Sequence, residues 1–257
     1  MILLDPNARP VIGHRGNRAH APENTLPSLL EAVALGADAV EFDVQVTRDG
    51  VLVLMHDLTL DRTTDASGAV AAYTFAELQG VDAGAHFTRN GRDFPWQGRG
   101  AGVPRFDDVI EALPRDLPLI VEVKTPSATP ALVQAIARHN LTARVIVAGF
   151  DPASTMPMRH GAIALGASTP DVARLLAPAL LRRRVPRPWY RALCIPPTRR
   201  GIPVPVGSIV RAVREHDVVT HVWTVNEPAR AQRLWRQGVQ GIISDDPALI
   251  LAARRGL

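Results

Sequence analysis

The sequence predicts an α/β fold built on a parallel sheet, a TIM-type (β/α)8 barrel. The chain has 257 residues, a usual size for one barrel domain of this type. Short apolar runs bounded by Gly, Pro and Asp recur along it, with helical apolar patterns between most of them. Hydrophobic residues make up 46% of the chain, which is enough for a large core. We therefore expect residues 1–257 to form a single domain.

Nine apolar runs are candidate strands, one more than an eight-stranded barrel needs. The second and third are joined only by residues 45–50, too short for a crossover helix, and Asp49-Gly50 is a typical turn pair. One of these two runs is therefore expected to be a hairpin arm, and the pattern fits either. The candidates are Val11–Gly13, Ala39–Val44, Val51–Met55, Leu119–Val123, Val145–Ala148, Ile163–Leu165, Ala192–Ile195, Thr220–Val225 and Gly241–Ser244.

The predicted helices have recognisable ends. Asn24 can cap a helix whose apolar positions between Leu26 and Val33 repeat at helical spacing, and Gly36 ends that helix. Residues 83–102 instead contain five glycines and little periodicity, so we expect a small loop-rich insertion within the barrel. Further helices are expected to begin at Thr129-Pro130, Asn226-Glu227-Pro228 and Asp246-Pro247.

The composition is that of a cytoplasmic protein. Cys194 is the only cysteine, so no disulfide can form within the chain, and a reducing compartment suits it. No signal-peptide pattern and no apolar stretch of about 20 residues is present, so stable membrane insertion is not expected. The formal net charge of +4 is carried almost wholly by arginine, and Lys124 is the only lysine. This charge favours anionic partners, but an arginine-rich composition alone also explains it.

Polar residues cluster at the same end of successive predicted strands. In an α/β barrel the C-terminal strand ends form the active-site mouth, so these side chains should lie close together. Packing alone does not explain such a series. Its members are His14, Arg15, Glu41, Asp43, His56, Asp57, Glu122, Lys124, Asn226, Asp245 and Asp246.

Three acidic residues form a candidate metal site. Glu41 and Asp43 lie two apart on one predicted strand, so their side chains share a face, and Glu122 lies at the end of the fourth candidate strand. Carboxylates that converge at a barrel mouth repel one another unless a cation lies between them. Oxygen ligands suit Mg²⁺ or Ca²⁺, so we expect one divalent cation of this kind. The alternative is that these acids form ion pairs with Arg15 and Lys124 without a metal.

His14 and His56 are the natural pair for proton transfer, because an imidazole can give or take a proton near neutral pH. Arg15 can hold a phosphate in a bidentate manner, and Lys124 adds a compact positive charge. This set suits phosphoryl chemistry, in which negative charge develops on phosphorus-bound oxygens. Acyl transfer is poorly supported, since Cys194 lies in a proline-flanked stretch and no serine occupies a G-x-S-x-G turn.

These motifs resemble the glycerophosphodiester phosphodiesterase family, within the phospholipase C-like phosphodiesterase superfamily. The resemblance extends from Val11 to Pro247, with little signal between Asp151 and Pro205. It is carried by His14-Arg15-Gly16 with Pro22-Glu23-Asn24-Thr25, Glu41-Phe42-Asp43-Val44, Thr47-Arg48-Asp49-Gly50, His56-Asp57, Glu122-Val123-Lys124, Trp223-Thr224-Val225-Asn226 and Gly241-Ile242-Ile243-Ser244-Asp245-Asp246-Pro247.

The resemblance implies hydrolysis of a glycerophosphodiester to sn-glycerol 3-phosphate and an alcohol. It implies attack by the glycerol 2-hydroxyl, followed by opening of a cyclic phosphate by water. The implied roles are acid–base catalysis for His14 and His56, and metal binding for Glu41, Asp43 and Glu122. Arg15 and Lys124 are implied to bind the phosphate. Supporting or pocket positions are implied for Glu23, Asn24, Asp57 and Trp223, with Asn24 mainly a helix cap.

Two other functions fit parts of the sequence. Phe87, Phe94 and Trp96 in the insertion could form an apolar entrance, as a lysophospholipase D-like or phospholipase C-like enzyme with a lipid substrate would need. The cluster Arg182–Arg187 would suit a non-catalytic barrel that binds anions or nucleic acid, but no interleaved aromatic residues accompany it. We therefore expect a small-molecule substrate and no nucleic acid. The motifs leave open the alcohol, the choice of metal and the oligomeric state.

Overall fold

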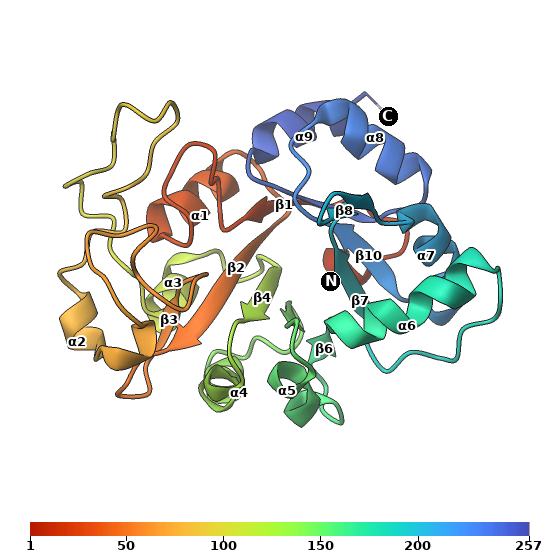
Figure 1. Ribbon diagram of the computed structural model, residues 1–257, viewed down its shortest axis with the longest axis horizontal. Coiled ribbons are helices and arrows are strands. Elements are labelled where there is room, and N and C mark those ends of the chain that lie inside the picture. Colours follow the sequence, from red (N-terminus) through yellow and green to blue (C-terminus); the bar gives the residue numbers. More distant parts are fainter. Residues whose placement is uncertain (257) are drawn as a thin grey trace.

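A computed structural model describes residues 1–256 of the chain, which form a barrel of parallel strands with helices outside it (Figure 1). The strands follow the order β6-β5-β4-β2-β1-β11-β10-β7 around the barrel. A single parallel bridge between Gly166 and Ala192 joins the two ends, so the ring is nearly closed. This confirms the predicted fold class. The barrel strands are β1 (Val11–His14), β2 (Ala39–Val46), β4 (Leu119–Val123), β5 (Val145–Ala148), β6 (Ala164–Leu165), β7 (Ala192–Ile195), β10 (Val219–Val222) and β11 (Gly241–Ser244).

The surplus strand candidate is the third one. β3 (Leu52–Leu54) pairs antiparallel with the end of β2, with Val46 opposite Leu52 and Val44 opposite Leu54. The connection of a few residues permits a hairpin but no helical crossover, so β3 cannot take a place among the parallel strands. β2 is consequently the longest strand of the barrel, and its second half carries this hairpin beside the mouth.

Helices cover the outside of the barrel and shield the apolar faces of the strands. The predicted first helix starts one residue later than expected: its N-cap is Thr25, and the expectation that Asn24 caps it is wrong. Asn24 has a positive φ of 56°, which turns its side chain toward the barrel interior instead. The outer helices are α1 (Leu26–Ala34), α3 (Phe106–Ala112), α4 (Thr129–Arg138), α5 (Pro152–Thr155), α6 (Thr169–Leu180), α7 (Val206–Val213), α8 (Pro228–Arg236) and α9 (Pro247–Arg254).

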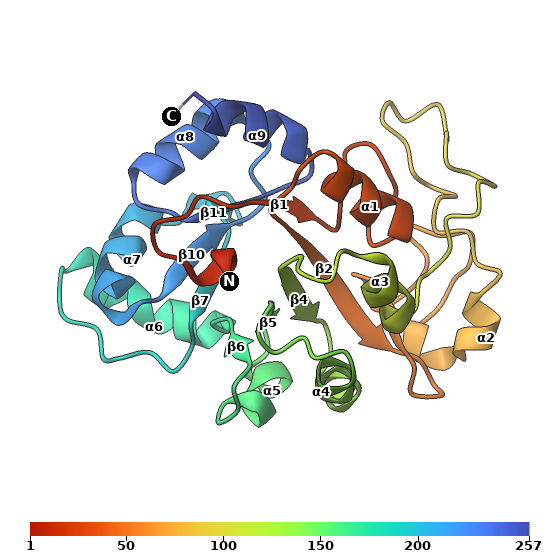
Figure 2. The same cartoon turned by 180° about the vertical axis from the view of Figure 1, so that it is seen from behind.

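The two ends of the barrel interior differ in character. At the N-terminal strand ends, the short helix η1 (Ile2–Leu4), red near the N label in Figure 2, places the fully buried Leu3 against Ile12 and Ile243. His221 on β10 faces the same region, and its Nε2 donates to the Leu3 carbonyl at 3.0 Å. This end is therefore closed by packing. The charged side chains Glu41, Asp43, Glu122 and Lys124 lie at the opposite end, where the strands finish.

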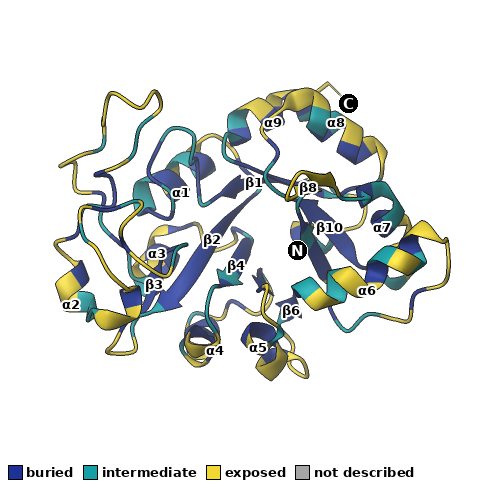
Figure 3. Cartoon of the chain, in the orientation of Figure 1, coloured by how far each residue is buried: buried dark blue, intermediate teal, exposed yellow. Residues whose placement is uncertain are grey.

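The segment between β3 and α3 leaves the barrel. It contains the short helices η2 (Val70–Ala72) and α2 (Phe75–Leu78) and otherwise irregular chain, much of it exposed in Figure 3. It has a small core of its own, which includes Leu60, Val70 and Leu78. Trp96 ties it to the rim of the barrel, since its Nε1 donates to the His20 carbonyl at 3.1 Å. The loop-rich stretch 83–102 is the outer part of this excursion.

Within residues 1–256, no helix has the length and apolar character needed to cross a membrane.

Candidate active site

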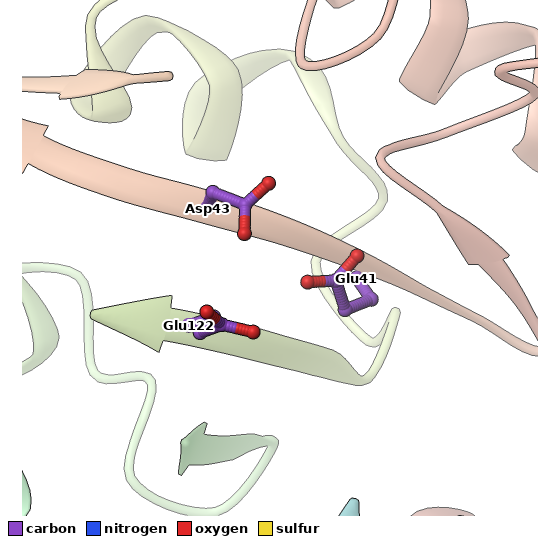
Figure 4. A group of neighbouring side chains, drawn as sticks. All are labelled: Glu41, Asp43 and Glu122. Carbon is purple, nitrogen blue, oxygen red and sulfur yellow. The ribbon is translucent and has the colours of Figure 1, made fainter. Parts of the chain in front are cut away.

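Three carboxylates meet at the mouth of the barrel. Glu41 and Asp43 project inward from β2, because residues two apart on a strand share a face. Asp43 lies beside Glu122 in the parallel register of β2 and β4. One oxygen from each of the three side chains lies within 4.8 Å of the others, and Figure 4 shows them along the facing parts of the two strands. The structure therefore brings together the three residues predicted as metal ligands.

The two positive side chains at this site are shared unevenly among the acids. Asp43 has both, with Arg15 Nε at 3.0 Å and Lys124 Nζ at 3.1 Å. Lys124 Nζ also contacts a carboxylate oxygen of Glu122. Glu41 accepts a hydrogen bond from the Arg15 backbone N–H at 3.1 Å, but no cationic side chain among residues 1–256 pairs with it. The ion-pair alternative thus accounts for Asp43 and Glu122 and leaves Glu41 without an ion pair among residues 1–256.

The pKa shifts follow this unequal sharing. Burial, and then the like charges of Asp43 and Glu122, raise the pKa of Glu41 well above its ordinary value. Burial also acts to raise the pKa of Asp43, but Lys124 and Arg15 outweigh it and hold that pKa low. Three carboxylates facing two fixed positive charges form a buried, oxygen-rich site with an excess of negative charge. A hard divalent cation such as Mg²⁺ or Ca²⁺ fits such a set of ligands.

The loop after β1 presents Arg15 to the acids by an unusual backbone path. Arg15 and Asn24 have positive φ angles of 52° and 56°, a conformation that costs roughly 1–3 kcal/mol and persists only where its surroundings fix it. Asn24 Nδ2 donates to Asp43 Oδ2 at 2.9 Å, and Asn24 Oδ1 accepts from the Asp43 N–H. Gly16 between them has φ +90°, and a Cβ there would lie 2.4 Å from Ser28. These contacts explain why glycine and asparagine occupy those positions.

His14 is held from behind by a carboxylate. Its Nδ1 lies 2.6 Å from Asp245 Oδ1, at the end of the neighbouring strand β11. Asp245 is itself fixed, since Asn226 Nδ2 donates to its other oxygen at 3.0 Å and Arg18 lies 3.4 Å away. Burial acts to raise the pKa of Asp245, but its hydrogen bond and charge interaction with His14 prevail and lower it to about 2. Asp245 is therefore ionised at neutral pH and holds His14 in one orientation.

His56 is held in the same way. Its Nδ1 lies 2.5 Å from Asp57 Oδ1, and Arg62 from the excursion donates Nε to the other oxygen of Asp57. Arg62 also donates to both oxygens of Glu23, which in turn contacts Arg15 at 2.7 Å. Burial, with a contribution from the positive charges of Arg15 and Lys124, lowers the pKa of His56, so its imidazole is neutral at pH 7.

Both histidines line one pocket with Glu41, Glu122 and Lys124. Because a carboxylate occupies each Nδ1, Nε2 is the ring nitrogen left to exchange protons in that pocket. Apolar side chains line the same pocket, among them Trp223, whose ring centroid lies 5.7 Å from that of Phe150.

Cys194 also lines this pocket. Burial, followed by the negative charges of Glu41 and Glu122, raises the pKa of its thiol, so the thiol stays protonated. A protonated thiol is a poor nucleophile, which agrees with the poor support for acyl transfer in the sequence.

Sequence reasoning gave no role to Asp245, Arg62 or Phe150. Asp245 was visible as a polar residue at the end of the last strand, but its partner His14 lies 231 positions away. Neither Arg62 nor Phe150 belongs to the series of polar residues at predicted strand ends, so that pattern could not identify them.

The chain is similar to known proteins over almost its whole length. The family model described as "Glycerophosphoryl diester phosphodiesterase family" matches residues 14–249. A glycerophosphodiester phosphodiesterase of Caldanaerobacter subterraneus subsp. tengcongensis is 33% identical over 96% of this chain and 98% of its own length. A glycerophosphodiester phosphodiesterase of Bacillus subtilis is 28% identical over 99% of this chain and 89% of its own length.

Solved structures share the fold over almost the whole chain. An Oleispira antarctica phosphodiesterase, solved in complex with the product sn-glycerol-3-phosphate, aligns with a TM-score of 0.77 and 26% identity, covering 96% of this chain and 97% of that one. A glycerophosphoryl diester phosphodiesterase domain from Mycobacterium tuberculosis has a TM-score of 0.86 at 22% identity, covering 98% of this chain and all of that one. The matched motifs, the shared barrel and the near full-length relatives lead to one conclusion: this chain belongs to the glycerophosphoryl diester phosphodiesterase family.

Proposed function

We propose that this protein hydrolyses glycerophosphodiesters to sn-glycerol 3-phosphate and an alcohol, with the help of one divalent cation. The observation that carries the proposal is the arrangement of His14 and His56, each fixed through Nδ1 by an aspartate beside the acidic cluster. Near full-length relatives named glycerophosphodiester phosphodiesterases support this reaction, as does the relative that holds sn-glycerol-3-phosphate.

Glu41, Asp43 and Glu122 are the residues that would hold the cation. Their fit rests on three carboxylates whose oxygens lie within 4.8 Å of one another, and on burial and the two like charges that raise the pKa of Glu41. When bound, Mg²⁺ or Ca²⁺ supplies positive charge to the oxygens of the phosphoryl group. Arg15 and Lys124 add fixed positive charge beside the same position and stabilise the negative charge that develops there.

The two imidazoles carry the protons in the first step. The glycerol 2-hydroxyl attacks phosphorus, and its proton passes to Nε2 of one histidine as the new O–P bond forms. The bond from phosphorus to the alcohol breaks, and the alcohol oxygen takes a proton from the other histidine. Because both reacting groups belong to one bound molecule, the step is intramolecular, which is worth several orders of magnitude in rate.

The second step returns both histidines to their starting states. Water attacks the cyclic phosphate and gives its proton to the histidine that acted as the acid. The bond between phosphorus and the 2-oxygen breaks, and that oxygen receives the proton held by the other histidine. sn-Glycerol 3-phosphate is released, and each residue has served once as acid and once as base.

An assay of glycerol 3-phosphate release tests the proposal. The substrates are glycerophosphocholine, glycerophosphoethanolamine and glycerophosphoglycerol, each with and without excess chelator. We expect turnover that the chelator abolishes and that Mg²⁺ or Ca²⁺ restores. A diester that lacks the 2-hydroxyl should bind but hardly react. Faster turnover of lysophosphatidylcholine than of glycerophosphocholine would instead support the lipid-substrate alternative, and full activity in chelator would contradict metal dependence.

A further inference from the structure

The positive charge of this chain is concentrated in one segment. Residues 172–214 contain ten arginines and no aspartate or glutamate. Since the whole chain has a formal charge of +4, this segment carries +10 and the remaining residues carry −6. The segment comprises most of α6, the loop after it, β7, the hairpin of β8 (Thr198–Arg199) and β9 (Ile202–Pro203), and α7. The molecule is therefore electrically polarised, a property that the proposed chemistry does not use.

The arginines at the end of α6 are free of acidic partners. Arg182, Arg183 and Arg184 are exposed, and none forms an ion pair with any residue from 1 to 256. They line one surface pocket together with Arg211 from α7, and Glu215 is the only acidic residue beside them. α6 and α7 are packed together on the outside of the barrel (Figure 1), so this pocket lies on an outer face and not at the mouth. Unpaired positive charges held this close together repel one another, which an anionic partner would relieve.

Exposed apolar side chains lie directly beside these charges. Leu180 and Leu181 are 60% and 62% exposed, and Figure 3 shows this end of α6 in the exposed colour. Among the described large hydrophobic residues, only Ile202 is more exposed, at 71%, and it belongs to the same basic segment. Clustered arginines with adjacent exposed leucines are the combination by which proteins bind the surface of an anionic bilayer.

We propose that Leu180, Leu181, Arg182, Arg183, Arg184 and Arg211, the basic patch, dock on an anionic phospholipid surface. The arginines would contact the lipid phosphates, and the two leucines would enter the boundary between headgroups and acyl chains. A nucleic acid explains the arginines but not the leucines, and the only aromatic residues of the segment, Trp189 and Tyr190, are not exposed for base stacking. A symmetric contact with a second copy would bring like charges together. This proposal does not depend on the reaction proposed above.

Co-sedimentation with vesicles tests the basic patch. The full chain is mixed with vesicles of phosphatidylcholine, alone or with 30 mol% phosphatidylglycerol (about one anionic lipid in three), and binding is measured at low and high salt. The first variant replaces Arg182, Arg183 and Arg184 with Glu. Its control replaces Arg89, Arg92 and Arg99 with Glu, three exposed arginines of the excursion without ion pairs among residues 1–256, so the net charge changes equally. Thermal denaturation of each variant shows that it is folded.

We expect binding to the anionic vesicles alone, weakened by salt. An arginine near an anionic surface contributes about fivefold, so the Arg182–Arg184 variant should lose on the order of 100-fold in affinity, and the control no more than about threefold. Leu180→Ser with Leu181→Ser should cost on the order of 10-fold. The same change at Leu35 and Leu249, which are also exposed, should have little effect.

Three results would overturn the proposal. The first is failure of the wild-type chain to bind anionic vesicles even at low salt. The second is an equal loss of affinity in the two arginine variants, which would indicate attraction by net charge and no defined patch. The third is patch-dependent binding of a random-sequence DNA duplex without binding of vesicles, which would assign the arginines to nucleic acid.

Discussion

His14 Nδ1 and Asp245 Oδ1 lie 2.6 Å apart, although 231 positions separate the two residues in the chain. The contact exists because β1 and β11 are parallel neighbours, with Gly13 opposite Ser244, so that His14 at the end of β1 and Asp245 just after β11 reach the same rim. The first and the last motif of the chain thus meet at one histidine, a proposed proton carrier. Asn226 holds Asp245 in place: its Nδ2 donates to the Asp245 carboxylate, and its Oδ1 accepts from the Asp245 backbone N–H.

Asp245→Asn should lower kcat by about 100-fold, within the range that acid–base catalysis contributes. The amide retains the shape of the Asp245 side chain but lacks its negative charge. That charge keeps Nδ1 of His14 protonated and stabilises the His14 imidazolium. Because Asp245 acts through His14, we expect KM to change little. Steady-state kinetics and the pH profile of kcat check this.

The matched control is Asp246→Asn. Asp246 is the next residue and pairs with His20 at 3.0 Å, and its Oδ1 accepts from the Leu249 N–H at the start of α9. Asparagine is also a good N-cap, so the helix should be unaffected. A loss of activity in this variant equal to that of Asp245→Asn would show that the effect arises from altered rim structure.

His14→Ala and His56→Ala should each lower kcat by at least about 100-fold, because each removes a proton carrier from both steps. His160, which is exposed and outside the site, provides the control His160→Ala. Single-turnover and steady-state measurements separate the chemical step from product release. Near-normal turnover of either site variant would remove that histidine from the mechanism.

Much of the fold and the candidate site could be predicted because strand ends in a parallel barrel fix positions in space. His14, Glu41, Asp43 and Glu122 follow that rule, and the structure places them around one mouth. His56 reaches the same mouth by a different route, because β3 runs antiparallel to the end of β2 and leads the chain back toward the acids. The surplus strand could not be chosen from the apolar pattern, because both arms of a hairpin alternate alike. Only the pairing of β2 with β4 shows that β3 lies outside.

The role of Asn24 illustrates what local pattern misses. Asparagine before an apolar helix reads as an N-cap, yet here Thr25 takes the cap position and Asn24 bonds Asp43 through both amide atoms. Asparagine tolerates the left-handed backbone, so the same residue satisfies either use. The contact of Arg62 with Asp57 and Glu23 was equally hidden, since it depends on how the irregular excursion folds back.

Glu41→Gln should separate metal binding from catalysis. Because burial and two like charges raise the pKa of Glu41, its ionised form destabilises the metal-free fold above pH 4.5, and the neutral amide removes that effect. We expect the metal-free variant to melt about 2–4 °C higher at pH 7.5, the shift that roughly 1 kcal/mol gives at this chain length. Addition of Mg²⁺ or Ca²⁺ should raise the Tm of the wild type and hardly that of the variant.

The control for this prediction is Asp93→Asn, an exposed acid in the excursion. It should melt as the wild type does with and without metal. An unchanged thermal shift with metal in Glu41→Gln would show that Glu41 is not a ligand, whatever the activity of the variant.

His221 should make the fold sensitive to acid. Burial lowers its pKa to about 4, and its Nδ1 has no hydrogen-bond partner among the described residues. The unfolded state, with a pKa near 6.5, therefore binds a proton first as the pH falls, and the free energy of unfolding decreases between pH 6.5 and about 4. The loss is about 1.4 kcal/mol per pH unit and about 3 kcal/mol in total.

Urea denaturation at pH 7, 6 and 5 gives the free energy of unfolding of the wild type and of His221→Gln. The contribution of His221 is the difference between the slopes of this free energy against pH for the two proteins. Glutamine can still donate to the Leu3 carbonyl, as Nε2 of His221 does, but cannot be protonated. The imidazole of His221 fits only because residue 241 is glycine: a Cβ at that position would lie 2.1 Å from Nδ1 of the ring. Gly241→Ala should therefore be strongly destabilising at every pH. Parallel pH slopes for the wild type and His221→Gln would show that another group causes the acid sensitivity.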